Sequence, residues 1–533
     1  MATNRVYEWV DERTGIKPAL DYVLYRRIPK TVDWFFTLGS ASLTVFLIQA
    51  VSGIFLAMGY TPSNAPVNIT VNGQPFVSTE ALESVRHLTN SVPLGDWIRG
   101  FHHWGANAMV IVVLLHMLHS FFCGSYKYPR ELTWFVGVFL LLFVLGFSFT
   151  GYLLPWDNRA YWATQVGISI GGSAPIVGPI VADVLRGGPT LGAATLTRFY
   201  AIHVLILPTL MALFIGLHLF LIVKIGISGT PAYKEQISGE YFDSVGKSSK
   251  KGGRAFFPYT IIEDAVVSFL VLAAVIALTL FIPVGNTNPA DPNNGVDSVS
   301  GQRFDPKPEW YFLFLFQFLK VVPSLNIGPL SLPSAAIGGI IIPTVVILLL
   351  FLAPVLDRSP KRHPLNRPIA SGVMLFFIVA IVGLTIWAFR ANASDNIEEA
   401  WGKAKIQLAP AAAVAGGAAT GAGTAQGGGA AATPGTGGAA PVGGNLDQAA
   451  VQAGLKLFQS NGCSGCHSQN GNAAGGLGPI LKGDPIAKSA AATKDQIRNK
   501  AVAPMQKYPP DQISDADLDK ITTYILSLNS NSK

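Results

Sequence analysis

Four histidines lie inside long apolar runs of this sequence, where an ionisable side chain is costly and is therefore a candidate for function. His102 and His116 stand fourteen residues apart in one run, and His203 and His218 stand fifteen apart in another. At about 100° per residue, each pair lies on one face of its helix, with roughly 21 Å between its members. The two helices are expected to run in the same direction, so that His102 faces His203 and His116 faces His218. Two trans imidazoles in an apolar slot are a ligand set for haem, and the sequence therefore predicts two non-covalent b-type haems.

Four glycines repeat the fourteen-residue spacing in neighbouring runs, as Gly39 and Gly53 and as Gly137 and Gly151. A flat macrocycle requires the backbone to approach closely, and only glycine has no side chain in the way. For a single glycine, packing between membrane helices is the stronger interpretation. Two pairs at the histidine spacing favour packing against haem.

Other polar residues of these runs have plainer interpretations. His103 is an alternative to His102 as a ligand, but its spacing to the second histidine of the run is one residue less favourable. His103 and His119 are otherwise expected to be packing or interfacial histidines, and Cys123 is expected to be inert. Arg99, three residues before His102, could pair with a haem propionate.

The composition is typical of a membrane protein. Of the 533 residues, 50% are hydrophobic and only 13% are charged, whereas soluble proteins carry about 25% charged residues. The net charge of +7 does not indicate nucleic acid, because the basic residues lie in short loops beside apolar runs. Residues 1–33 are polar and contain no cleavable signal peptide, so the run from Trp34 is expected to serve as an uncleaved insertion signal.

Seven apolar runs are long enough to span a bilayer as helices, which takes about 20 residues. We place them near residues 34–58, 103–122, 133–153, 200–223, 262–283, 336–356 and 369–389. Two further stretches, 310–322 and the Gly/Pro-rich 167–189, are expected to be interfacial or re-entrant. Lysine and arginine are concentrated at the ends shared with the N-terminus, which predicts a cytoplasmic N-terminus in a bacterial inner membrane. Seven crossings then place everything after Phe389 on the outer side.

These patterns divide the chain into five segments. A cytoplasmic segment (1–33) precedes a four-helix di-haem domain (34–230), a three-helix domain (231–390), an Ala/Gly-rich linker (391–445) and a small soluble domain (446–533). The expected fold class is all-α: a seven-helix transmembrane haem-binding bundle plus a small all-α soluble domain. The Ala/Gly-rich part of the linker cannot form a core and would be flexible, with a root-mean-square reach of roughly 35 Å.

The soluble domain carries Cys463 and Cys466, followed directly by His467, which is the signature for covalent attachment of a c-type haem. The thiols would form thioethers and His467 would bind the iron, with Met505 as the candidate sixth ligand. A zinc or redox Cys-x-x-Cys site is the alternative, which the adjacent histidine and the lack of a second Cys/His pair oppose. With one helix expected before this motif and another from Ser514, the domain resembles a class I monohaem cytochrome c.

Four segments make residues 30–390 resemble the cytochrome b/b6 family, the haem-bearing core of the quinol-oxidising cytochrome bc and bf complexes. They are Gly-Tyr-Leu-Leu-Pro-Trp-Asp at 151–157, Tyr-Lys-Tyr-Pro-Arg-Glu-Leu-Thr-Trp at 126–134, Leu-Thr-Arg-Phe-Tyr at 196–200 and Pro-Glu-Trp-Tyr at 308–311. The last is the most telling, because it lies in the long loop between the fifth and sixth apolar runs. The fifteen-residue step and the lack of an eighth run resemble the chloroplast and cyanobacterial form, in which the part after the fourth helix is a separate subunit.

The resemblance implies an outer quinol-oxidation site around Glu309, whose carboxylate would accept a proton from quinol. Glu309 and Tyr311 would be catalytic. The residues expected to line or shape the site are Pro308, Glu309, Trp310, Tyr311, Tyr152, Pro155 and Tyr161. Lys224 and Asp33 are candidates for an inner quinone site. The similar form tethers an extra inner-side haem to a cysteine where this sequence has Thr37, so only an untethered extra haem is considered.

The implied function is that of a cytochrome b–c fusion subunit of a proton-translocating quinol–cytochrome c oxidoreductase in a respiratory chain. One electron would pass to a Rieske-type iron–sulfur protein and then to the haem at His467, and the other would cross the two b haems to reduce quinone on the inner side. The Rieske centre requires a partner subunit, because the two cysteines beyond Cys123 are committed to the c-type haem.

Further expected partners are the quinone pool, an outer cytochrome or other electron acceptor, the lipid membrane and a second copy of the complex, but no nucleic acid. Two alternatives remain open. One is a membrane haem b anchor of a dehydrogenase without electron bifurcation, and the other is a transporter or structural membrane protein. The first does not account for the Pro-Glu-Trp-Tyr segment, and the second leaves the histidine spacing and the Cys-x-x-Cys-His motif unexplained.

Overall fold

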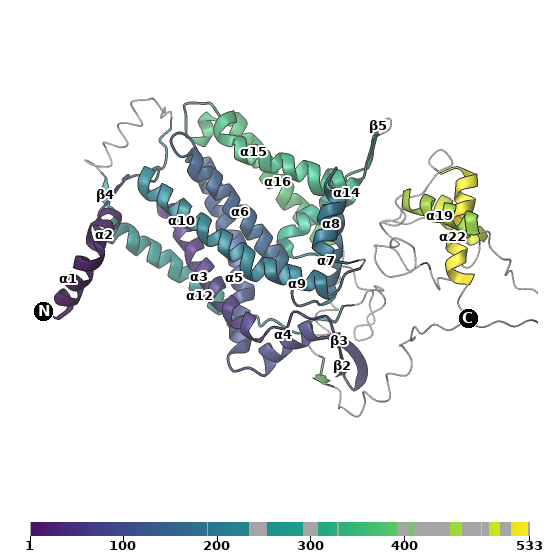
Figure 1. Ribbon diagram of the computed structural model, residues 1–533. Coiled ribbons are helices and arrows are strands. Elements are labelled where there is room, and N and C mark those ends of the chain that lie inside the picture. Colours follow the sequence, from purple (N-terminus) through teal and green to yellow (C-terminus); the bar gives the residue numbers. More distant parts are fainter. Residues whose placement is uncertain are drawn as a thin grey trace, which may run out of the picture.

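The computed structural model describes residues 2–188, 190–233, 253–290, 307–327, 330–391, 404–408, 448–460, 481, 490–500 and 513–530. Within these ranges, seven helices are long and apolar enough to cross a membrane, as predicted (Figure 1). They are α3 (Leu38–Gly59), α5 (Gly95–Phe122), α6 (Glu131–Tyr152), α9 to α10 (Ala193–Ile225), α12 (Ile261–Phe281), α14 to α15 (Ser334–Leu356) and α16 (Pro368–Ala391).

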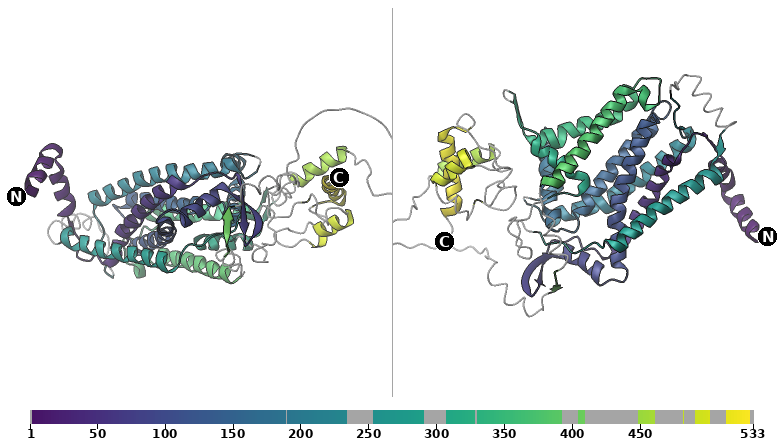
Figure 2. Two further views of the ribbon diagram at one scale, coloured as in Figure 1. Left: turned by 90° about the horizontal axis from the view of Figure 1, so that it is seen from below. Right: turned by 180° about the vertical axis from the view of Figure 1, so that it is seen from behind.

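The helices pack side by side in one bundle (Figures 1 and 2). α5 packs against α3, α6 and α12, and α6 packs against α10 and α15. The short apolar helix α13 (Leu313–Val321) packs against α16. Large apolar side chains remain exposed on the outside of the bundle, among them Phe269, Leu270 and Phe376. Exposing such side chains to water would be unfavourable, whereas the hydrocarbon core of a bilayer would bury them.

The two ends of the bundle carry different structures. One end holds α4 (Glu80–Asn90), α7 (Asn158–Gly172) and α8 (Gly178–Arg186). Glu309 belongs to this end because its side chain contacts Arg159 of α7, and we call it the Glu309 end. The stretch predicted to be interfacial, 167–189, contributes the end of α7 and all of α8, neither of which is among the seven spans. The opposite end holds α1 (Ala2–Thr14) and α2 (Ile16–Leu24), and we call it the N-terminal end.

The Glu309 end also carries a small antiparallel sheet, which the all-α expectation did not include. β2 (Pro66–Val71) and β3 (Gln74–Thr79) form a hairpin around Asn72 and Gly73, both with positive φ. This backbone is the one that a two-residue hairpin turn requires, and Asn-Gly is its commonest sequence. The alternation of Val67, Ile69 and Val71 directly before Asn-Gly is therefore a strand signal that the helical interpretation did not use.

The third strand of this sheet corrects the predicted extent of the linker. β7 (Ile406–Leu408) pairs antiparallel with β2, although it falls inside the Ala/Gly-rich part of the linker, 403–445, for which the sequence predicts flexibility. Ile406 packs against a core that includes the buried Ile69 and Val71. One apolar side chain and a short ladder of backbone hydrogen bonds thus fix this part of the linker on the hairpin.

The C-terminal unit is built, within the residues that the structure describes, around α19 (Gln448–Ser460) and α22 (Asp515–Ser530). The two helices cross at Gly454, where any side chain would collide with the carbonyl of Lys520. Ser514 caps α22 by accepting a hydrogen bond from the backbone amide of Asp517 (3.2 Å), as its position predicted. The shared core contains Phe458, Leu518, Ile521, Tyr524 and Ile525. Cys463, Cys466, His467 and Met505 lie outside the described residues.

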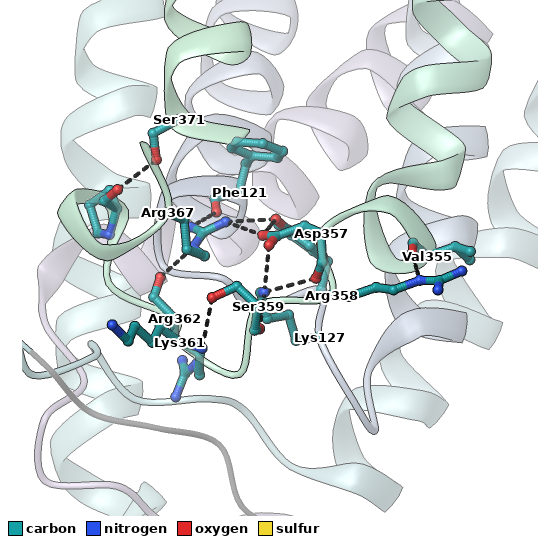
Figure 3. Close-up of polar contacts among 12 residues, drawn as sticks. Phe121, Lys127, Val355, Asp357, Arg358, Ser359, Lys361, Arg362, Arg367 and Ser371 are labelled. Atoms are coloured by element: carbon teal, nitrogen blue, oxygen red, sulfur yellow. Dashed lines mark hydrogen bonds and ion pairs between the residues drawn. The ribbon is translucent and has the colours of Figure 1, made fainter. Parts of the chain in front are cut away.

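The N-terminal end is held together by an enclosed cluster of charges (Figure 3). Asp357, just after α15, pairs with Lys127 (2.9 Å) and Arg367 (2.7 Å) and accepts a hydrogen bond from the Tyr126 hydroxyl (2.5 Å). The side chains of Arg367 and Asp357 are only 0% and 9% exposed. Arg367 also donates to the carbonyl of Phe121, in the last turn of α5. The cluster therefore ties α5 and the loop after it to the junction between α15 and α16.

The protonation of Asp357 follows from these contacts. Burial by itself would raise its pKa, but the hydrogen bonds from Tyr126, Lys127 and Arg367 outweigh burial and hold the pKa below its ordinary value of 3.8. A depressed folded-state pKa means that the stabilisation is complete above the ordinary value. It is lost as the pH falls through the folded-state pKa.

Replacing Asp357 by Asn is expected to destabilise the bundle, because Lys127 and Arg367 would be left enclosed without their counter-charge. Breaking a buried pair costs about 3–5 kcal/mol, so the thermal unfolding midpoint of the purified protein in detergent should fall clearly. The matched control is Asp183→Asn, because Asp183 is 77% exposed in its pair with Arg186 and such a pair contributes about 0–1 kcal/mol. Equal unfolding midpoints for the two variants would show that the cluster is not a stabilising joint.

Candidate haem and quinol sites

The first imidazole pair joins His102 of α5 to His203, which lies in a single π-helical turn, η2 (Ile202–Ile206), between α9 and α10. Their ring centroids are 6.3 Å apart and their planes meet at 77°. Two metal–nitrogen bonds of about 2 Å and two ring radii of about 1 Å add up to about 6 Å. The distance between the rings therefore fits a site in which both imidazoles would hold one haem iron.

The second pair, His116 of α5 and His218 of α10, lies toward the N-terminal end. The two side chains are close enough to interact electrostatically. The Nδ1 atom of each ring is enclosed by protein and makes no hydrogen bond to the residues that the structure describes. Among the described residues, no side chain therefore engages Nδ1 of either ring at this pair.

Each of the four predicted glycines lies against one predicted ligand. An added Cβ would meet the Cε1 atom of a histidine ring at 3.3, 3.2, 3.4 and 2.6 Å for the pairs Gly39–His116, Gly53–His102, Gly137–His218 and Gly151–His203. The sequence predicted that these glycines make room for the macrocycle. The structure gives them a more specific task, because each leaves space for the imidazole that would bind the iron.

The π-helical turn accounts for the unequal histidine spacing. Such a turn holds one more residue than a turn of α-helix, and His203 lies inside it. It therefore absorbs the extra residue in the fifteen-residue step from His203 to His218. The two imidazoles then keep nearly the separation of the fourteen-residue step in α5.

The contacts of the two adjacent histidines favour His102 over His103 as the predicted ligand. The ring of His103 lies beside Trp104, with centroids 5.0 Å apart, and within electrostatic reach of Glu309. His102 is the one that faces His203.

The two candidates for an inner quinone site, Asp33 and Lys224, contact different residues. Asp33 lies 3.7 Å from Nε2 of His119, while the ammonium group of Lys224 sits 5.5 Å above the ring of Phe220. These contacts do not bring the two candidates together. Thr37, at the position of the tethering cysteine in the similar form, is buried, and its hydroxyl donates to the carbonyl of Trp34 (2.6 Å).

Arg99 is already engaged by protein groups. Its guanidinium donates to the hydroxyl of Thr89 (3.0 Å) and to the carbonyls of Val284 and Gly285 (3.3 Å each). These bonds fasten the segment after α12 to α4 and α5. The predicted pairing of Arg99 with a haem propionate would have to share or replace them, and it stays a prediction.

Glu309 forms an ion pair that the sequence did not reveal. Its Oε1 lies 2.8 Å from Nη1 of Arg159, and the side chains are 18% and 30% exposed. Arg159 stands 150 residues earlier in the chain, so no spacing rule could link the two. The pair makes Glu309 an oriented carboxylate that water can still reach.

Trp310 and Tyr311 anchor the segment after Glu309 to the bundle. Nε1 of Trp310 donates to Oδ1 of Asn107 on α5 (2.6 Å), and the Tyr311 hydroxyl points to the carbonyl of Ser148 on α6 (3.4 Å). Burial, with a smaller contribution from the charge of Glu309, raises the pKa of Tyr311. Its phenol therefore stays protonated and can donate a hydrogen bond.

Of the remaining predicted pocket residues, some lie near Glu309 and others support the helix that carries Arg159. Tyr152 is within electrostatic reach of Glu309, and Pro308 directly precedes Glu309. Tyr161 packs against Trp156 and Trp162 in the apolar core beneath the hairpin. There it supports α7, which begins next to Pro155 and the capping residue Asp157.

Replacing Gly151 by Ala is expected to displace His203, because the added Cβ would lie 2.6 Å from Cε1 of that ring. One of two b-type haems should then be lost, as measured by difference spectroscopy of the purified protein. The same change at Gly137 leaves 3.4 Å to His218, an ordinary contact, and should retain both haems. Gly383→Ala is the control, because nothing lies within 4 Å of its added Cβ. Full haem retention after Gly151→Ala would contradict the role given to His203.

Three family models match successive parts of the chain. Cytochrome b(N-terminal)/b6/petB matches residues 107–289, and Cytochrome b(C-terminal)/b6/petD matches residues 305–399. Cytochrome C oxidase, cbb3-type, subunit III matches residues 449–525. The order of the three agrees with the two membrane parts and the C-terminal cytochrome c domain predicted from the sequence.

Individual relatives agree with these matches. The chain is 32% identical to the cytochrome bc complex cytochrome b subunit of Chlorobaculum thiosulfatiphilum over 391 residues, which are 73% of this chain and 81% of that protein. It is 41% identical to the menaquinol:cytochrome c reductase cytochrome b subunit of Bacillus subtilis (strain 168) over 234 residues, 42% of this chain and 98% of that one. Among solved structures, a chain of a hyperthermophilic respiratory Complex III matches with a TM-score of 0.58 and 26% identity, covering 73% of this chain and 93% of its own. The chain therefore belongs to the cytochrome b/b6 family of bc-type complexes and carries a cytochrome c domain fused to its C-terminal part.

Proposed function

We propose that this chain is the cytochrome b–c subunit of a proton-translocating quinol–cytochrome c oxidoreductase and that quinol is oxidised beside Glu309. The position of the Glu309 segment carries the proposal. Trp310 binds it to Asn107 on α5, the helix that also carries His102 of the imidazole pair at this end. A quinol at this end would find a proton acceptor and a redox site on neighbouring elements.

Glu309 is suited to accept a proton from quinol. Quinol must lose two protons as it loses two electrons, so a base within hydrogen-bond reach is required. The side chain of Glu309 is 18% exposed, which gives the accepted proton a way to water. Arg159 orients the carboxylate through a charge-assisted hydrogen bond, and the protonated hydroxyl of Tyr311 would border the quinol head group.

The cofactors would be held by the residues identified above. When bound, they would supply one-electron carriers: two b-type haems at His102/His203 and His116/His218, and one c-type haem at Cys463, Cys466, His467 and Met505. The geometry of the first imidazole pair and the glycine beside each of the four rings support the two b-type sites. An extra haem near Thr37 would be untethered.

The proposal extends to orientation and partners. The N-terminal end would face the cytoplasm of a bacterial inner membrane, with protons taken up there and released at the Glu309 end. A Rieske-type iron–sulfur subunit, an outer electron acceptor and a second copy of the complex would complete the assembly. The relative from Bacillus subtilis is named a menaquinol:cytochrome c reductase subunit, which makes menaquinol a candidate substrate from the quinone pool.

A redox-difference spectrum of the purified complex, together with its quinol–cytochrome c reductase activity, distinguishes the proposed function from the two alternatives. Two b-type components together with one c-type component are expected. A membrane haem b anchor of a dehydrogenase would show the b-type bands without quinol–cytochrome c reductase activity. A transporter or structural protein would show none of these bands. Absence of either the paired b-type or the c-type signal would remove the basis of the proposal.

Replacing Glu309 by Gln should slow quinol oxidation by about 10²-fold or more, the scale of losing a general base, because an amide cannot accept the proton. Arg159→Gln should slow it less, since the carboxylate remains but is no longer oriented. The measurement is steady-state quinol–cytochrome c reductase activity per haem, with haem content checked in each variant. Glu80→Gln is the control, as Glu80 is exposed at the same end of the bundle. Turnover of the Glu309 variant equal to that of the control would refute the assigned role.

A further inference from the structure

The residue before each haem-site glycine differs between the two imidazole pairs. At the Glu309 end the sequences are Ser52-Gly53 and Thr150-Gly151, and at the N-terminal end they are Leu38-Gly39 and Val136-Gly137. The glycines occupy equivalent places beside their rings. The preceding position therefore carries a hydroxyl at one pair and only hydrocarbon at the other.

Both hydroxyls reach the ring nitrogen of the neighbouring ligand. Oγ of Ser52 lies 3.0 Å from Nδ1 of His102, and Oγ1 of Thr150 lies 2.9 Å from Nδ1 of His203. The two contacts come from different helices, α3 and α6, and are nearly equal in length. The arrangement is thus a matched pair, one hydroxyl for each ring of the first site.

The direction of these hydrogen bonds follows from the other contacts of the hydroxyls. Ser52 donates to the carbonyl of Ile48 (2.7 Å) and Thr150 donates to the carbonyl of Gly146 (2.8 Å), each one turn earlier in its own helix. A hydroxyl has a single hydrogen to donate. Where Nε2 of a ring binds iron, the ring hydrogen is on Nδ1. The Nδ1–H group then donates to the hydroxyl, whose own hydrogen goes to the carbonyl.

The second imidazole pair lacks this support. Nδ1 of His116 and Nδ1 of His218 are enclosed and make no hydrogen bond to the part of the chain that the structure describes. Backbone carbonyls come near both rings of the first pair, Gln49 at His102 and Phe147 at His203, and near one ring of the second, Thr133 at His218. The hydroxyls are the side-chain part of the difference in hydrogen bonding between the two sites.

We propose that Ser52 and Thr150 are positioning residues that lower the reduction potential of the haem at His102 and His203 relative to the haem at the second pair. A hydrogen bond accepted from Nδ1–H raises the basicity of the imidazole. A more basic ligand stabilises ferric iron more than ferrous iron, and hydrogen bonding of this kind is one of the protein's levers on haem potential. An electron that enters at the Glu309 end then meets a carrier of higher potential toward the N-terminal end. The inference rests on the two b-type haems of the proposed function.

The test is an optical redox titration of both b-type midpoint potentials in the purified, haem-loaded complex. Thr150→Val removes the hydroxyl and keeps the shape of the side chain, and Ser52→Ala removes the hydroxyl at the other ring. Each should raise the same one of the two midpoints, by roughly twofold to tenfold in the reduction equilibrium, where tenfold corresponds to about 59 mV for one electron. The double variant should raise that midpoint further and leave the other in place.

The converse variant adds a hydroxyl where the chain has none. Val136→Thr places it before Gly137, beside the ring of His218, and should lower the midpoint that the other variants leave unchanged. This variant still tests the effect of the hydroxyl on the midpoint potential if Thr150→Val or Ser52→Ala does not retain its haem. Thr209→Val is the control, because the hydroxyl of Thr209 on α10 donates, among the described residues, to the carbonyl of Leu205 in η2 (2.7 Å) and to no histidine ring. Both midpoints should stay in place.

Two results would overturn the inference while the proposed function stands. One is unchanged midpoints in Thr150→Val, Ser52→Ala and Val136→Thr with haem retained. The other is an equal shift of both midpoints in each variant, which a general loosening of the bundle would produce. Absence of b-type haem from the unsubstituted complex is a different result, because it would overturn the proposed function itself.

Discussion

The placement of four imidazoles inside an apolar bundle is the constraint on which the rest of this structure depends. A polar ring in such surroundings is costly unless its nitrogens find partners and the neighbouring backbone leaves it space. Glycines on α3 and α6 provide that space for rings carried by α5 and by the segment from η2 to α10. The equal spacing of glycines and histidines follows from this pairing, and the π-helical turn at His203 brings the fourth helix into the same register.

The ion pairs at the two ends of the bundle differ in their exposure to water. At the N-terminal end, Asp357 and Arg367 are enclosed and fully paired, an arrangement that holds helices together and has little access to water. At the Glu309 end, the ion pair with Arg159 is partly exposed. An exposed carboxylate can exchange its partner and its proton, whereas an enclosed one cannot do so without a large penalty. The difference in exposure thus separates a structural joint from a site suited to chemistry.

The two membrane parts matched by separate family models, 107–289 and 305–399, form one polypeptide here. Their packing does not rest on the covalent connection alone. Nε1 of Trp134 donates to the carbonyl of Leu350 (2.8 Å), and Arg362 donates to the carbonyl of Gly229 (2.7 Å). Together with the Asp357 cluster, these bonds satisfy polar groups of one part with groups of the other. Such an interface would hold the same bundle together whether or not the chain is continuous.

The sequence by itself determined the seven membrane helices, the two histidine pairs, the glycines beside them and the cap of α22 at Ser514. Hydropathy, helical spacing and capping are local properties, so they can be recognised at fixed intervals along the chain. The Pro-Glu-Trp-Tyr segment was recognised in the same way, as a short motif in a suitable loop.

Only the tertiary structure decided which groups meet across those intervals. It placed Arg159 on Glu309, the hydroxyls of Ser52 and Thr150 on the histidine rings, and β7 on the hairpin. It also showed that the glycines face imidazoles. Ion pairs and hydrogen bonds require distances of about 3 Å between particular atoms. Those distances are set when several helices pack at once, and no spacing within one segment specifies them.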